Sequence, residues 1–148
     1  MNSCGPFAVW IRRLLYLAVA ASALLLGASG AYALFSDSGL RGYLLMAHTS
    51  LGGLFAVTLA LFAVCYGERF RLVPDTPVHV GQRICFWLFL VLGATSALSV
   101  SLCMLPLAGT HGQHLLVATH RYCGYGIALT GLAHLYFVVS SKKTSCNA

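Results

Sequence analysis

Four long runs of apolar residues dominate the chain, at about 14–35, 43–66, 84–105 and 115–139. A helix needs roughly 20 apolar residues to cross the hydrocarbon core of a bilayer, and each run meets that length. Segments containing glycine, proline, serine and charged residues separate the runs, at 36–39, 67–77 and 106–109. This pattern predicts an all-α membrane protein, a four-helix bundle that forms a single domain over residues 1–148.

Charged residues are scarce, at 8% of the 148 residues, against about 25% in a typical soluble domain. Membrane lipid is therefore the expected environment of the helices. The net charge of +6 would suit nucleic acid. However, the basic residues mostly flank the apolar runs, where they orient membrane helices. We expect no nucleic-acid partner.

The basic residues also predict how the chain is oriented. They lie before the first run, around the second loop and after the last run, as Arg12, Arg13, Arg69, Arg71, Arg83, Lys142 and Lys143. The positive-inside rule then places both termini and the second loop in the cytoplasm, for a multi-pass protein of the cytoplasmic (inner) membrane. Alternatively, residues 12–33 could belong to a cleaved signal peptide, but their apolar run is long for one.

Three histidines, His48, His120 and His134, lie inside the predicted spans. An imidazole facing lipid is costly, so such histidines are functional candidates, although some only form hydrogen bonds between helices. His48 and His120 each lie about five residues from the outer end of their span, roughly 8 Å deep at the helical rise. Two imidazoles at one depth on different helices could ligate one iron from opposite faces.

A glycine follows each of these two histidines after one helical turn, as Gly52 and Gly124. A glycine on the ligand's face of the helix leaves room for a flat porphyrin against the backbone. The repeated H-x-x-x-G pattern therefore predicts a bis-histidine haem b between the second and fourth helices. Arg121, beside His120, could pair with a haem propionate or extend to the lipid headgroups.

Other candidate chemistry is weaker. His111 and His114 have a spacing that could suit a metal on a helix, but no cysteine or carboxylate completes a site, so we expect them to face solvent or a partner. The three carboxylates all lie outside the spans, which disfavours a proton pump. We identify no catalytic residues, and whether the chain itself reduces a quinone stays open.

Further motifs lie in the third and fourth runs: Gly81-Gln82-Arg83 followed by Phe86-Trp87, and His134-Leu135-Tyr136 fourteen residues after His120. With the H-x-x-x-G pairs, they resemble the membrane cytochrome b (gamma) subunits of respiratory formate dehydrogenases. The chain is similar, more loosely, to the cytochrome b subunits of nickel–iron hydrogenases and to bacterial b561 cytochromes.

The resemblance implies that the chain anchors iron–sulfur and catalytic subunits on the outer face of the membrane. Electrons would pass from an iron–sulfur cluster to an outer haem on His48 and His120, then to an inner haem and to menaquinone. His134 matches one ligand of the inner haem, and the segment with His79, Gly81 and Gln82 matches the quinone site.

One position departs from the family. Tyr16 stands where the resemblance implies the second histidine of the inner haem. We therefore expect one haem b, with His134 hydrogen-bonded to a quinone or to a neighbouring helix. A second haem would require Tyr16 or His79 as a ligand. The alternative function is a haem-free membrane anchor descended from such a cytochrome.

Overall fold

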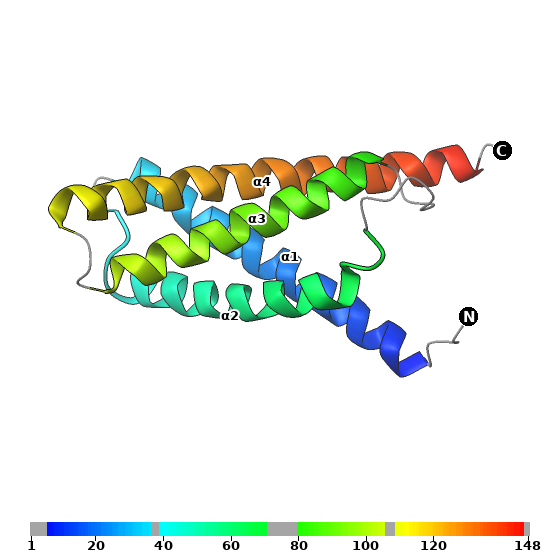
Figure 1. Cartoon of the computed structure of the whole chain (residues 1–148), viewed down its shortest axis with the longest axis horizontal. Coiled ribbons are helices and arrows are strands. Elements are labelled where there is room, and N and C mark those ends of the chain that lie inside the picture. The colour runs from blue at the N-terminus through cyan, green and yellow to red at the C-terminus, as the bar shows by residue number, and fades with distance from the viewer. Residues whose placement is uncertain (1–5, 37–38, 71–79, 106–108, 147–148) are drawn as a thin grey trace. The chain divides into compact units, whose positions relative to one another are not determined.

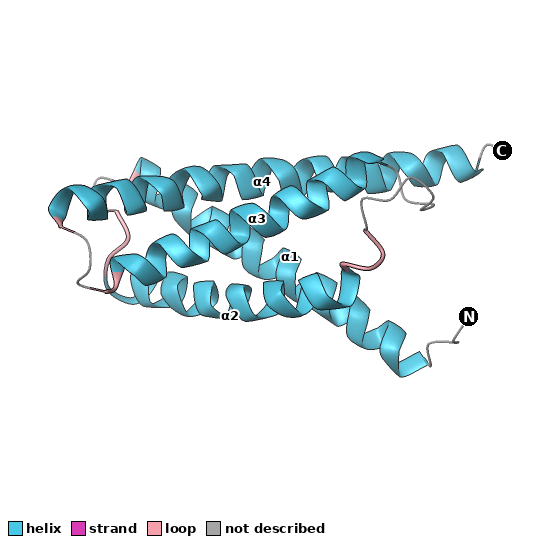
Figure 2. Cartoon of the chain, viewed as in Figure 1, coloured by secondary structure: helices cyan, strands magenta, loops and turns pink. Residues whose placement is uncertain are grey.

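A computed structural model describes residues 6–36, 39–70, 80–105 and 109–146, and all regular structure in these ranges is helical. The helices are α1 (Pro6–Phe35), α2 (Gly42–Tyr66), α3 (Val80–Cys103) and α4 (Thr110–Cys146), as shown in Figures 1 and 2. The all-α prediction is confirmed, with one predicted run in each helix. The third run was predicted to end at residue 105, whereas α3 ends at Cys103.

The chain divides into two compact units, Met1–Gly67 and Glu68–Ala148. In the first, which we call the first hairpin, α1 packs against α2. In the second hairpin, α3 packs against α4. The two helices of each hairpin run in opposite directions (Figure 1). Packing is thus established within each hairpin, and the assembly of all four helices into one bundle stays a prediction.

Two glycines turn the chain between α1 and α2. Gly39 has a φ of +62° and Gly42 a φ of +55°, a left-handed conformation that side chains with a Cβ rarely adopt. Arg41 between them is extended and precedes the first turn of α2. This short reversal returns α2 along α1 and so determines which of their residues can meet.

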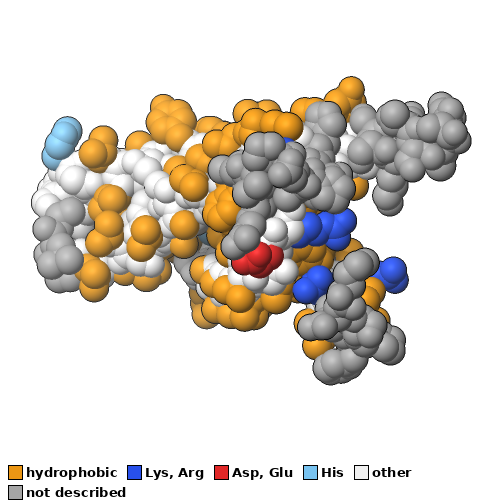
Figure 3. All heavy atoms as spheres, turned by 45° about the vertical axis from the view of Figure 1, so that its right-hand side comes forward, with side chains coloured by type: hydrophobic (Ala, Val, Ile, Leu, Met, Phe, Trp, Pro, Cys, Tyr) orange, Lys and Arg blue, Asp and Glu red, His pale blue; other side chains and the backbone are white. Residues whose placement is uncertain are grey.

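Three helical segments are long and apolar enough to cross a membrane: Val9–Phe35, Gly42–Tyr66 and Val80–Cys103. Large hydrophobic side chains on these helices are exposed, and Figure 3 shows many such side chains on the face that it draws. These are features of a multi-pass membrane protein. The described part of α4 is not among the segments that are long and apolar enough to cross, so a crossing by residues 115–139 stays a prediction.

Hydroxyl groups in the apolar helices donate to backbone carbonyls of the preceding turn. Ser22 donates to the carbonyl of Ala18 at 2.7 Å, and Thr58 to that of Leu54 at 2.9 Å. Such bonds satisfy a polar group where water is absent. Ser29 makes the same kind of bond, at 2.9 Å from the carbonyl oxygen of Leu25.

Candidate functional site

His48 in α2 is hydrogen-bonded to Ser29 of α1 within the first hairpin. The distance from Ser29 Oγ to His48 Nδ1 is 2.7 Å, and His48 is half-buried. The Ser29 hydroxyl also lies 2.9 Å from the carbonyl oxygen of Leu25 and 3.0 Å from that of Leu26. The single hydroxyl proton of Ser29 can go to one of these carbonyls or to His48 Nδ1, so the direction of the bond between Ser29 and His48 depends on the tautomer of the imidazole.

His120 in α4 makes the equivalent contact with Ser96 of α3 in the second hairpin. Its Nδ1 lies 2.9 Å from Ser96 Oγ and 3.2 Å from the carbonyl oxygen of Ser96. The Ser99 hydroxyl donates to that same carbonyl oxygen at 2.8 Å. The direction of the bond between Ser96 and His120 depends on which nitrogen of the imidazole carries the proton: a protonated Nδ1 donates to Ser96, and an unprotonated Nδ1 accepts from the Ser96 hydroxyl.

With the proton on Nδ1, both imidazoles would donate to the serine of the neighbouring helix. A neutral imidazole with its proton on Nδ1 has its lone pair on Nε2, which is a common metal-ligating atom in proteins. Histidine ligands generally use their other nitrogen to hold the ring in place through a hydrogen bond. His48 and His120 thus both have the chemistry of a ligand that binds through Nε2.

The glycines one turn after the histidines lie beside open space. A Cβ built on Gly52 or on Gly124 would meet nothing within 4 Å. Gly126, two residues after Gly124, differs, because a Cβ there would lie 2.8 Å from Cδ1 of Leu92. The backbone one turn from each histidine can therefore be approached by a flat group. Within each hairpin, a histidine one turn before such a glycine is compatible with one face of a haem, and a haem shared by the two hairpins stays a prediction.

The pattern around the histidines extends further than the glycine. Ala56 and Thr58 follow His48 at the same distances as Ala128 and Thr130 follow His120, so both helices read H-x3-G-x3-A-x-T. Each threonine hydroxyl bonds a carbonyl one turn earlier, and the Thr130 distance to the carbonyl of Gly126 is 2.7 Å. The two hairpins thus carry matching second helices.

Comparison with protein-family models, with curated proteins and with solved structures found no match. The assignment to a family therefore stays a resemblance based on motifs. The argument for function must come from the chemistry of the residues themselves.

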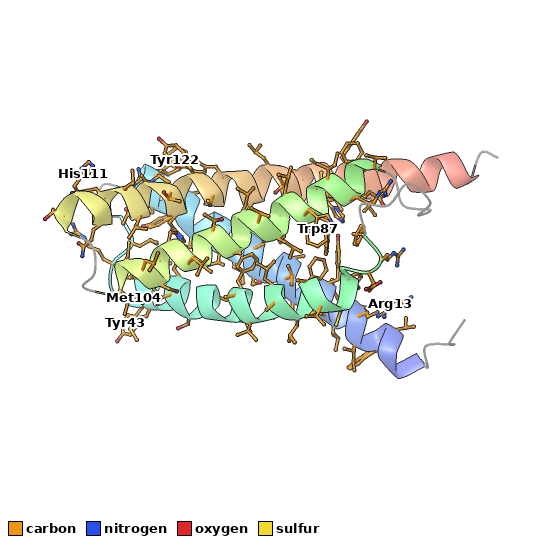
Figure 4. The ribbon with its side chains drawn as sticks, viewed as in Figure 1. Arg13, Tyr43, Trp87, Met104, His111 and Tyr122 are labelled. Atoms are coloured by element: carbon orange, nitrogen blue, oxygen red, sulfur yellow. The ribbon has the colours of Figure 1, made fainter. Side chains whose placement is uncertain are left out.

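His48 and His120 belong to different hairpins, so their pairing on one iron stays a prediction. Among the described residues, no group of three or more histidine, cysteine or acidic side chains could hold a metal. His111 and His114 are exposed, and Figure 4 shows His111 at the start of α4. Arg121 is exposed, and its partner, propionate or headgroup, stays a prediction.

Three other predicted site residues gather where the start of α3 meets α4. Gln82 Nε2 donates to the carbonyl oxygen of Phe137 at 3.1 Å, and a Cβ on Gly81 would lie 2.9 Å from the Phe137 ring. His134 lies one turn before Phe137, with its ring edge toward Phe70 at a centroid distance of 5.9 Å. Its Nδ1 is buried and has no hydrogen-bond partner among the described residues. His79, predicted for the same site, lies outside the described residues.

Tyr16 lies in an aromatic cluster of the first hairpin. Its ring is 5.9 Å from that of Phe62, which is 4.7 Å from that of Tyr66. Phe62 follows His48 by fourteen residues, just as His134 follows His120. Fourteen residues after the outer histidine, the first hairpin therefore has a cluster of aromatic rings, whereas the second hairpin has an imidazole.

The sequence interpretation did not identify Ser29 and Ser96 as partners of the histidines. Serines are frequent in membrane helices, and neither spacing to its histidine is a recognised motif. The available signal was a polar residue inside the preceding span of each hairpin. Only the pairing and rotation of the helices show that these serines meet the imidazoles.

Proposed function

We propose that the chain is a haem b-containing electron-transfer subunit of a respiratory oxidoreductase complex in the cytoplasmic membrane. His48 and His120 hold one haem b, and the chain passes electrons between an iron–sulfur partner on the outer face and the quinone pool. The observation that carries this proposal is the matched pair of histidines. Each has its Nδ1 within hydrogen-bond distance of a serine hydroxyl on the neighbouring helix, and each precedes a glycine beside open space.

The haem would supply a one-electron carrier that no side chain here provides. The chain's own residues hold it: His48 and His120 through Nε2, Gly52 and Gly124 by leaving room, and Arg121 as the partner of a propionate. In this proposal the reaction with the electron donor takes place in the partner subunits.

The proposed quinone site lies at the other end of the second hairpin, with Gly81, Gln82 and His134. A buried nitrogen without a hydrogen bond costs about 1–3 kcal/mol. The Nδ1 of His134 has no hydrogen-bond partner among the described residues, and a bound quinone or quinol would give it one. In this proposal His134 forms a hydrogen bond to the quinone and does not bind a haem. This agrees with Tyr16, which stands where the resemblance implies the second histidine of an inner haem.

A pyridine haemochrome assay tests the proposal on the purified chain and its variants. We expect about one haem b per polypeptide, as a single bis-histidine site requires. His48→Ala and His120→Ala should each lose most of the haem, because one axial ligand disappears. His134→Ala should retain it.

His114→Ala is the matched control, since His114 is an exposed histidine on the same helix as His120. It should bind haem like the unsubstituted chain. Absence of haem from the unsubstituted chain would contradict the proposal and favour the haem-free anchor. Two haems per chain, one of them lost in His134→Ala, would show that His134 is an axial ligand.

A further inference from the structure

We infer that the ring of Phe70 occupies the place of the quinone ring beside His134, and that a quinone binds by displacing it. This inference rests on the proposed quinone site within the second hairpin and deepens it. It assigns a role to a residue that lies before α3, outside the proposed ligand set. It also predicts that a quinone binds more tightly when the Phe70 ring is removed.

The starting point is the buried nitrogen of His134. Its Nδ1 is inaccessible to solvent and has no hydrogen-bond partner among the described residues. A buried polar atom without a partner is costly, so a ligand that supplies the partner is favoured. A ligand atom can reach this nitrogen only if a group that covers the imidazole moves.

Phe70 lies against the imidazole and belongs to neither helix of the hairpin. Its side chain is buried, and its ring is 5.9 Å from that of His134 in an edge-on arrangement. Phe70 is part of a turn that precedes α3, whereas His134 is held within α4. The Phe70 ring can therefore leave the imidazole without separating α3 from α4.

The place that Phe70 occupies suits a flat ring. Phe70 stacks on Phe86 with ring centroids 4.5 Å apart and ring planes 18° apart. Phe86 belongs to α3, is 2% exposed, and meets Trp87 edge-on at 5.5 Å. Offset stacking at such distances is favourable for aromatic rings. A quinone ring in the same place would stack on Phe86, and its oxygen would be the partner that Nδ1 of His134 lacks.

A hydrogen bond from α3 holds Phe70 in this place. The indole Nε1 of Trp87 donates to the carbonyl oxygen of Phe70 at 2.9 Å, and Figure 4 labels Trp87 on α3. An indole N–H can only donate, so the direction of this bond is fixed. Loss of the bond should let Phe70 leave the imidazole more readily.

The competing interpretation is that Phe70 is a permanent wall of the site, on which the quinone rests. The two interpretations predict opposite changes in affinity. Removal of a wall weakens binding, because a stacking contact is lost. Removal of a ring that must first be displaced strengthens binding, because a larger fraction of the molecules is ready to bind.

The test is equilibrium dialysis of menadione against the purified full chain in detergent. Phe70→Ala should lower the dissociation constant about tenfold, which corresponds to a Phe70 ring displaced in about a tenth of the unsubstituted molecules. Phe70→Leu keeps an apolar side chain without a flat ring and should lower the constant less. Trp87→Phe should also lower it, because this variant loses the hydrogen bond to Phe70 but keeps an aromatic ring.

Phe55→Ala is the matched control, since Phe55 is a similarly buried phenylalanine of the first hairpin. It should leave the dissociation constant unchanged. His134→Ala, combined with Phe70→Ala, should abolish binding, because the polar partner of the quinone is then missing. If Phe70→Ala does not fold, Phe70→Leu and Trp87→Phe decide between the two interpretations by the same signs.

An unchanged or higher dissociation constant in the Phe70 variants would overturn the inference. So would equal changes in Phe70→Ala and Phe55→Ala, or no binding of menadione by any variant. Binding that persists without His134 would show that the quinone lies elsewhere. The haem content of the same preparation tests the proposed electron-transfer function separately, so failure of that function is distinguished from failure of this inference.

Discussion

At the scale of single residues, the chain treats its two outer histidines alike. Each imidazole has two nitrogens, and each places one of them against a serine of the neighbouring helix. An imidazole without such a partner would be costly in an apolar environment. The hydrogen bond to the serine lowers that cost.

The glycines provide a prediction at this scale. Gly52→Leu and Gly124→Leu should each reduce the haem content several-fold, since a branched side chain would fill the space that is open one turn from the histidine. Haem per polypeptide, from the absorbance of the reduced chain, is the measurement. Gly53→Leu is the control, because Gly53 also lies beside open space but is rotated by about 100° around the helix at 3.6 residues per turn. Equal losses in all three variants would contradict the role given to Gly52 and Gly124.

The sequence predicted the histidines but not their partners, for a physical reason. A histidine in an apolar run is conspicuous because its burial is costly. A serine is not conspicuous, because its hydroxyl can form a hydrogen bond to a backbone carbonyl in the preceding turn of its own helix. Ser22 and Ser29 are indistinguishable in this respect until α2 is placed beside α1.

At the scale of the elements, helix positions followed closely from the apolar runs. Length and hydropathy determine a membrane helix almost alone, because every backbone group must be satisfied within it. The helix α4 extends beyond its predicted run 115–139 at both ends, to Thr110 and Cys146. Polar residues at those ends do not interrupt a helix, although they reduce its apolar character.

Small residues allow α3 and α4 to approach each other, which leads to a prediction at the scale of the element. Gly126→Ala should leave the second hairpin about 1 kcal/mol less stable than Gly131→Ala, because both gain helix propensity but the new Cβ at position 126 would press on the Leu92 side chain. Loss of helicity in a denaturing detergent titration measures this. Gly131→Ala is the control, since its Cβ would lie at an ordinary 3.9 Å from Phe89. A Gly126→Ala variant as stable as Gly131→Ala would show that α3 and α4 do not pack closely at this point.

At the scale of the whole molecule, the distribution of charge carries the prediction of topology. Basic residues lie near the start of α1 and between α2 and α3, whereas the predicted outer loops hold only Arg41. The buried Arg83 belongs to the first turns of α3 and so lies at the end of that helix nearest the second loop. The charge pattern predicts an even number of crossings, whereas three helices of the described chain are long and apolar enough to cross.

Fusion reporters test this topology directly. Green fluorescent protein attached after residue 148 should fluoresce and alkaline phosphatase at the same site should be inactive, because the C-terminus is predicted to be cytoplasmic. Alkaline phosphatase inserted after Gly39 should be active. An active phosphatase at the C-terminus would mean that α4 does not cross, or that the first span is removed.

The serine–histidine pair within each hairpin has a consequence for how the protein is made. Membrane helices enter the bilayer in the order of their synthesis, and a polar side chain raises the cost of entry. Because Ser29 is synthesised before His48, and Ser96 before His120, each imidazole meets its serine partner as soon as its own helix pair forms. Each histidine therefore has a hydrogen-bond partner before the other hairpin or any iron is present. The proposed haem could then bind last, after both hairpins have inserted into the membrane.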